Sequence, residues 1–206
     1  RWLARPVAGI GPTWDDTQPL ATTDMVDQWA AFRAAIPWQI ATQQFNLLGS
    51  HDTPRLRTIL GGDPALVRVA FVLLFTYPGV PCVYYGDEIG LDGGPDPDCR
   101  RTMPWEPEAW DGALRSLVQT LVRLRRTAPA LRWGGFQLLH TSEHSVAFQR
   151  EAPEQRMVIV ARRADDGLRK APVRHGGLPD GAILRELFSG ATATIAGGHL
   201  PIGAAN

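Results

Sequence analysis

The hydrophobic positions in the first part of the chain alternate between short apolar runs and helical patterns. Phe45 to Leu48 and the run VPCVYYG from Val80 are short, apolar and bounded by glycine or polar residues, which predicts buried strands. The segment ALVRVAFVLLF between them is apolar on nearly every face, so it predicts a heavily buried helix. Asp63 and Pro64 suit the start of that helix, and Pro78 ends it.

Amphipathic helices are expected on either side of this unit. An early helix is capped by Thr23 or Asp24 and ended by Pro37, and a later one ends near Pro129. Apolar residues repeat every three or four positions in each, at Met25, Trp29, Phe32 and Ile36 and at Leu114, Leu117, Val118, Leu121 and Leu124.

The pattern changes to short strand-like segments near residue 132. These segments are FQLLHT, HSVAFQRE, RMVIVAR, AILRELFS and ATATIAG. Turn signals at Asp166-Gly167 and Asp180-Gly181 separate some of them. We therefore expect an α/β region over residues 1–132 and a small antiparallel β domain over residues 133–206.

Composition excludes several classes of protein. Hydrophobic residues make up 44% and charged residues 20% of the 206 positions, as in a folded domain. The formal net charge is zero, so nucleic acid is a poor candidate partner. No apolar run approaches the roughly 18 residues of a membrane span. Cys82 and Cys99 are too few for a disulfide framework, and reduced thiols agree with a cytoplasmic protein.

Two strands cannot close a parallel sheet that is buried on both faces. The α/β region predicts only two good strands, and the chain does not begin with Met. We therefore interpret it as the end of a larger α/β architecture whose beginning lies elsewhere.

Three motifs carry a resemblance to a known family. They are LLGSHDTPR, the run YPGVPCVYYGDEIG one helix later, and the D-P-D-C-R stretch in the next loop. In this order and spacing they resemble the α-amylase superfamily of glycoside hydrolases, within it the neopullulanase, cyclomaltodextrinase and maltogenic amylase group. The resemblance implies a TIM barrel followed by a C-terminal β-sandwich, with Asn46 to Gly49 as barrel strand seven and Pro81 to Tyr85 as strand eight.

The resemblance also implies roles for four residues. Active sites of TIM barrels lie at the carboxyl ends of the strands, where His51 and Asp52 follow strand seven. Asp52 matches the third carboxylate of this retaining family, which stabilises the transition state by binding sugar hydroxyls. His51 would donate to the same sugar. Asp96 and Arg100 match positions that bind a sugar further toward the non-reducing end.

Each assignment has a structural alternative. An His-Asp pair after a strand is often a turn or a helix cap, and Asp96 with Arg100 could simply pin the loop by an ion pair. Ser50, His51 and Asp52 are not a catalytic triad, because neighbours on an extended chain point apart. Structural roles are expected for Tyr84, Tyr85, Asp87 and Glu88.

The sequence also departs from the family. No G-x-R-x-D stretch supplies the nucleophile, since Arg163-Ala164-Asp165 lies beside a predicted Asp-Gly turn of the β domain. No segment resembles the one that carries the general acid. The chain would therefore hold one of three catalytic carboxylates and be inactive alone. No metal or other cofactor is assigned to this chain, and calcium is left open for the missing part.

The expected parent protein hydrolyses α-glucosidic bonds in maltodextrins, cyclodextrins or pullulan, with an α-glucan oligosaccharide as its substrate partner. The alternative is a non-catalytic carbohydrate-binding or assembly module that retains the last quarter of the barrel. Open strand edges tend to pair with other chains, so we expect an oligomer or association with the missing N-terminal portion.

Overall fold

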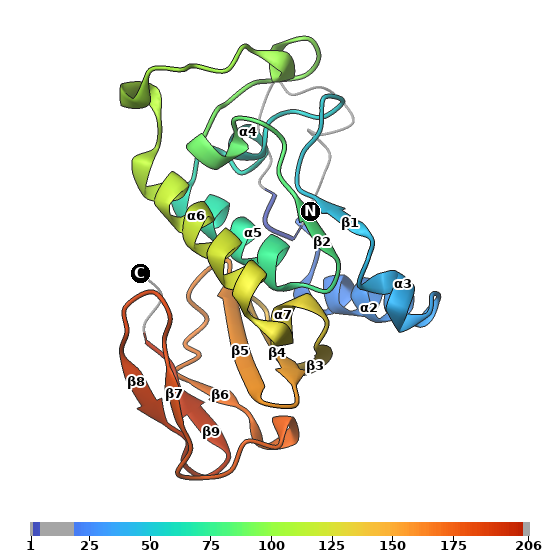
Figure 1. Cartoon of the computed structure of the whole chain (residues 1–206), viewed down its shortest axis with the longest axis vertical. Coiled ribbons are helices and arrows are strands. Elements are labelled where there is room, and N and C mark those ends of the chain that lie inside the picture. Colours follow the sequence, from blue (N-terminus) through green and yellow to red (C-terminus); the bar gives the residue numbers. More distant parts are fainter. Residues whose placement is uncertain (1, 5–18, 204–206) are drawn as a thin grey trace.

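Helices and two parallel strands precede residue 133, and antiparallel strands follow it (Figure 1). The computed structural model describes residues 2–4 and 19–203. The first group comprises α2 (Thr22–Ala34), α3 (Trp38–Ala41), β1 (Phe45–Leu47), α4 (Leu56–Ile59), α5 (Pro64–Thr76), β2 (Val80–Cys82), the 3-10 helices η1 (Asp87–Ile89), η2 (Asp98–Arg100) and η3 (Pro107–Ala109), α6 (Gly112–Thr127) and α7 (Pro129–Arg132). The second comprises β3 (Gly135–Thr141), β4 (Ser145–Ala152), β5 (Gln155–Arg162), β6 (Lys170–Pro172), η4 (Arg174–Gly176), β7 (Ile183–Arg185), β8 (Thr192–Thr194) and β9 (His199–Pro201). The division into two domains stays a prediction.

Strands β1 and β2 form a parallel pair that α5 connects. Phe45 lies opposite Val80 in the register. The predicted start of α5 is confirmed, because the Asp63 carboxylate accepts hydrogen bonds from the backbone N–H groups of Ala65 (2.9 Å) and Leu66 (3.2 Å). Parallel strands need such a crossover, and it brings both carboxyl ends to the same edge of the sheet.

The prediction that these two strands are buried is wrong. Phe45 is 75% exposed, Leu47 is 58% exposed and Val80 is 37% exposed. In the described part of the chain β1 and β2 pair only with each other, so no further strand adjoins them.

Helix α2 starts before the caps that the sequence suggested. Its first residue is Thr22, and neither Thr23 nor Asp24 caps it. The Thr22 hydroxyl instead accepts from the indole N–H of Trp2 (2.8 Å) and donates to the Glu143 carbonyl (2.6 Å). Tertiary contacts thus hold this helix start, which has no side-chain cap.

The C-terminal part contains three antiparallel sheets in the described residues, in the orders β3-β4-β5, β6-β9 and β7-β8. The predicted turns at Gly167 and Gly181 have the positive φ angles of 77° and 85° that favour glycine. Strands β6 and β9 were not predicted, because each is three residues long and contains a proline.

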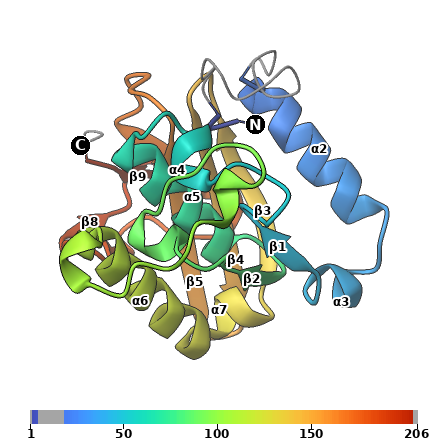
Figure 2. The same cartoon turned by 90° about the horizontal axis from the view of Figure 1, so that it is seen from above.

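Both parts of the chain share an apolar core. Figure 2 shows α5 in front of strands β3 to β5 and α2 beside β3. The buried members of this core are Trp2, Met25, Val146, Phe148, Ile159 and Ala161, and Val69, Val72 and Leu73 of α5 pack against them. None of the helices in the described residues is long and apolar enough to cross a membrane.

A buried arginine joins the two parts beside this core. Arg150 of β4 is fully buried, and its guanidinium donates to the carbonyl oxygens of Thr76 (2.7 Å), Gly134 (2.8 Å), Gly135 (3.0 Å) and Leu131 (3.2 Å). Burial lowers the pKa of Arg150 to about 9. Thr76 and Leu131 lie at the C-terminal ends of α5 and α7, where carbonyl oxygens carry partial negative charge. These oxygens therefore partly compensate the buried charge of Arg150.

We predict that Arg150→Met lowers the free energy of unfolding by about 3 kcal/mol, because several buried carbonyl oxygens lose their donors. Urea denaturation measures the change. The control is Arg156→Met on the neighbouring strand, whose ion pair with Glu151 is 41% exposed on each side and should contribute less than about 1 kcal/mol. Equal losses in the two variants would contradict the prediction.

Candidate functional site

The segment after β1 is a turn that exposes His51 and Asp52. The Ser50 backbone N–H donates to the Thr53 hydroxyl (3.1 Å), and the Asp52 backbone N–H donates to the Ser50 hydroxyl (3.2 Å). The side chains of His51 and Asp52 are 64% and 78% exposed, and Nε2 of His51 lies 3.2 Å from Oδ1 of Asp52. The expectation that these neighbours point apart is wrong, because the segment turns instead of running extended.

The predicted loop residues Asp96 and Arg100 form an ion pair with each other. Their side chains are about half exposed. An ion pair between these two residues is what the structural alternative, in which they only pin the loop, predicts. Both side chains remain accessible to a ligand, and the sugar-binding role stays a prediction.

A direct contact brings the two predicted segments together. The Cys99 thiol is fully buried and donates to the His51 carbonyl oxygen at 3.2 Å. Helix η2 therefore lies against the turn that carries His51 and Asp52. In this way residues about 48 positions apart in sequence become neighbours at the carboxyl ends of β1 and β2.

The loop around η2 is held by its own polar contacts. Arg101 donates to Asp98 (2.7 and 2.8 Å) and to Asp92 (2.6 Å), and the hydrogen bond from Arg101 lowers the pKa of Asp98. The Gly94 N–H donates to Asp98 (2.6 Å), and the Tyr85 hydroxyl donates to the Arg101 carbonyl (2.7 Å). The loop thus has a defined shape before any ligand binds.

Arg55, the buried cation beneath these loops, was not predicted from the sequence. Its guanidinium lies 3.4 Å from Asp87 and contacts the Tyr85 carbonyl oxygen. The signal for it was the arginine that ends the LLGSHDTPR motif. Nothing in that motif alone indicated that this arginine is buried.

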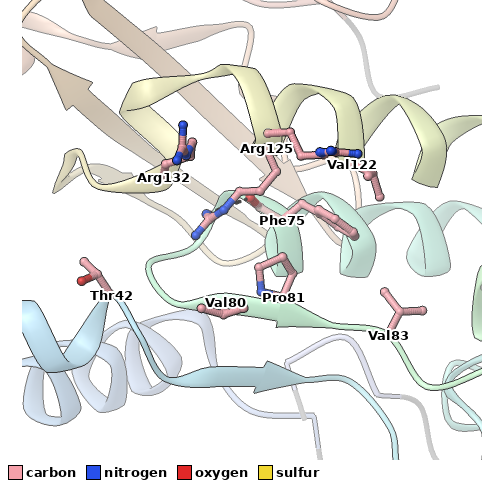
Figure 3. A pocket seen from close by; sticks show the side chains of 9 residues that line it. Thr42, Phe75, Val80, Pro81, Val83, Val122, Arg125 and Arg132 are labelled. Carbon is pink, nitrogen blue, oxygen red and sulfur yellow. Dashed lines mark hydrogen bonds between the residues drawn. The ribbon is translucent and has the colours of Figure 1, made fainter.

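A hollow beside β2 is lined by other residues. It has a volume of about 470 Å³ and is lined by Phe75, Val80, Pro81 and Val122, with Arg125 at its edge (Figure 3). The hollow runs along β2, from Val80 and Pro81 to Val83 just after the strand. None of the predicted site residues lines it.

No metal site is apparent in the described residues. Within residues 2–4 and 19–203, no group of three or more histidine, cysteine, aspartate or glutamate side chains is placed to hold a metal ion. The question of calcium in other segments is untouched by this finding.

Asp87 makes stability depend on pH. Burial raises its pKa to about 6, against the opposing effect of Arg55. The folded state then binds more protons than the unfolded state between pH 4 and 6, so this contribution is full below pH 4 and is lost as the pH rises through about 6.

We therefore predict that the free energy of unfolding falls by about 2 kcal/mol between pH 4 and 7 through Asp87, and that Asp87→Asn removes this fall. Urea denaturation across this range measures it. Asp98→Asn is the control and should keep the fall, because the pKa of Asp98 is lowered instead. The same slope in Asp87→Asn and in the unmodified chain would refute the prediction.

Comparisons with known proteins agree with the motifs. The family model described as "Alpha amylase, catalytic domain" matches residues 13–123, which is more than half of the 206-residue chain. A cyclomaltodextrinase from Geobacillus thermopakistaniensis (strain MAS1) is 38% identical over 160 residues, or 76% of this chain and 27% of the relative. The first two curated relatives are thus matched over 27% and 23% of their length.

Solved structures show the same similarity. A debranching enzyme from Nostoc punctiforme has a TM-score of 0.78 at 34% identity, over 89% of this chain and 38% of that chain. The cyclic alpha-maltosyl-(1→6)-maltose hydrolase from Arthrobacter globiformis, in complex with cyclic alpha-maltosyl-(1→6)-maltose, has a TM-score of 0.70 at 32% identity, over 76% of this chain and 35% of that chain. The fold is of the TIM-barrel glycosidase type, and the chain belongs to the α-amylase family of glycoside hydrolases.

Proposed function

We propose that the protein acts as a retaining hydrolase of α-glucosidic bonds in maltodextrin-, cyclodextrin- or pullulan-type substrates. The observation that carries this proposal is the contact between Cys99 and His51, which joins two family motifs at the carboxyl ends of β1 and β2. The names of a similar cyclomaltodextrinase and a similar debranching enzyme support the substrate class.

Asp52 stabilises the transition state in this proposal. Its carboxylate is exposed and would accept hydrogen bonds from hydroxyls of the sugar that is being cleaved. Such bonds tighten as the sugar approaches an oxocarbenium ion, so they accelerate the chemical step. His51, 3.2 Å away, would donate to the same sugar and hold the orientation of Asp52.

Asp96 and Arg100 bind a more distant sugar of the same chain. Their mutual ion pair presets both side chains, and the guanidinium keeps N–H donors for hydroxyl groups. Because these contacts are remote from the cleaved bond, they contribute chiefly to substrate binding.

The isolated chain is proposed to be inactive. The sequence contains no stretch that matches the nucleophile motif, and the exposed faces of Phe45 and Leu47 suit further barrel strands. This chain then supplies strands seven and eight, and the remaining catalytic carboxylates come from other parts of the protein.

We further propose that residues 133–206 form a β-sandwich. The sheet of β3, β4 and β5 packs on both of its faces. On one face Phe148 and Ile159 contribute to the core with α2 and α5. On the other, Leu139 and Val158 pack toward the shorter sheets. The core on that second side consists of Val173, Leu178, Ile195 and Leu200. Alternation of this kind is typical of a sheet between two layers.

A chimera tests the proposed activity. We predict that this chain, placed in the cyclomaltodextrinase over its 160 matched residues, restores release of reducing sugar from β-cyclodextrin. Asp52→Asn should lower kcat at least roughly 10²-fold, because the contact is made in the transition state. Asp96→Asn should mainly raise KM.

Asp92→Asn serves as the control, since Asp92 lies in the same loop but is assigned only to the ion pair with Arg101. A chimera that folds and cleaves β-cyclodextrin equally well with Asn at position 52 would overturn the proposal. It would favour the alternative of a non-catalytic carbohydrate-binding or assembly module. The unfused chain should release no reducing sugar.

We predict that the isolated chain self-associates through the open face of β1 and β2. Phe45→Ser with Leu47→Ser should shift sedimentation velocity profiles toward monomer at micromolar concentration. The control is Leu187→Ser with Phe188→Ser, which removes side chains of similar exposure (50% and 56%) elsewhere. A chain that is monomeric without any substitution would contradict the prediction.

A further inference from the structure

Arg55 connects the turn after β1 to both ends of the loop after β2. It follows Asp52 by three positions, and its side chain is fully buried. Its backbone N–H donates to the Gly93 carbonyl (2.9 Å), at the start of the loop that holds η2. Its guanidinium contacts the Tyr85 carbonyl oxygen and lies 3.4 Å from Oδ1 of Asp87.

Two aromatic rings complete the surroundings of this guanidinium. Its central carbon lies 4.2 Å from the ring centre of Tyr84 and 4.4 Å from that of Tyr85. The planar, weakly hydrated guanidinium suits such positions better than the ammonium group of lysine. Tyr85 then extends the connection, because its hydroxyl donates to the carbonyl of Arg101, the residue after Arg100.

The energetics argue against stability as the main contribution of Arg55. Its Nε and Nη2 atoms are buried and have no hydrogen-bond partner among the described residues. A buried ion pair with incomplete hydrogen bonding often stabilises a fold no more than apolar side chains of similar volume would. These contacts all link the turn after β1 to the loop after β2. They therefore fix the position of one relative to the other.

We infer that Arg55 is a positioning residue for oligosaccharide binding. It sets the loop of Asp96 and Arg100 relative to His51 and Asp52, so that one α-glucan chain can contact both pairs. The inference rests on the proposed function. It adds a residue that touches no sugar itself and acts through the two loops.

The test compares two buried arginines in the full 206-residue chain. Arg55→Lys and Arg150→Lys both keep the charge and lose the planar fork, but Arg150 lies between α5, α7 and β3. Hydrogen–deuterium exchange reports on residues 50–55 and 92–101, and isothermal titration calorimetry gives the Kd for maltoheptaose.

Both variants should lower the free energy of unfolding. Arg55→Lys alone should speed exchange in both loops and raise the Kd roughly tenfold or more, as expected when contacts lose their common geometry. Asp87→Asn keeps Arg55 and an acceptor oxygen but removes the carboxylate charge beside the guanidinium, so it should give a smaller change in the same direction. If Arg55→Lys does not fold, the loop exchange rates and the Kd of Asp87→Asn test the inference in its place.

Unchanged exchange in both loops would overturn the inference, whatever the effect on binding. Equal effects of Arg150→Lys on exchange and Kd would also overturn it, since they would indicate general destabilisation. If the unmodified chain binds no maltoheptaose while Arg55→Lys loosens both loops, the proposed sugar site fails and the positioning of the loops by Arg55 stands.

Discussion

The parallel pairing of β1 with β2 is the constraint on which the candidate site depends. Parallel strands place their carboxyl ends at the same edge, and α5 provides the crossover that makes the pairing possible. The turn of His51 and Asp52 and the loop of Asp96 and Arg100 therefore start from neighbouring points. The hydrogen bond from the Cys99 thiol to the His51 carbonyl oxygen brings this turn and this loop into contact.

The two buried arginines of the described residues, Arg55 and Arg150, have different surroundings. Arg150 is surrounded by carbonyl oxygens at helix ends and joins the helical part to the sheet of β3 to β5. Arg55 has one carboxylate, one carbonyl and two aromatic rings around it, and it joins two loops. The first arrangement satisfies backbone groups that would otherwise be buried without donors. The second leaves two donors unsatisfied, so it adds less to stability than its number of contacts suggests.

Sequence patterns predicted the elements that depend on local signals. The cap at Asp63, the helix that ends near Pro129 and the turns at Gly167 and Gly181 follow from short-range chemistry, and each is confirmed. The exposure of Phe45 could not be predicted, because apolar runs indicate burial without saying which strands cover them. Strands β6 and β9 were missed because their sequences, KAP and HLP, contain no apolar run that would mark a strand.

The sequence named candidate site residues but gave no indication of the contacts between their segments. The motifs named His51, Asp52, Asp96 and Arg100, and the structure adds the contacts that place these residues beside one another. Arg55 escaped notice because its role depends on tertiary neighbours about 30 positions away.

The central claim is that an α-glucan binds at the carboxyl ends of β1 and β2. A titration of the isotope-labelled chain with maltoheptaose, followed by backbone amide chemical shifts, tests it directly. We expect shift changes in residues 50–55 and 92–101, with little change in β6 to β9. Changes confined to the C-terminal sheets would contradict the account and place carbohydrate binding in a non-catalytic module.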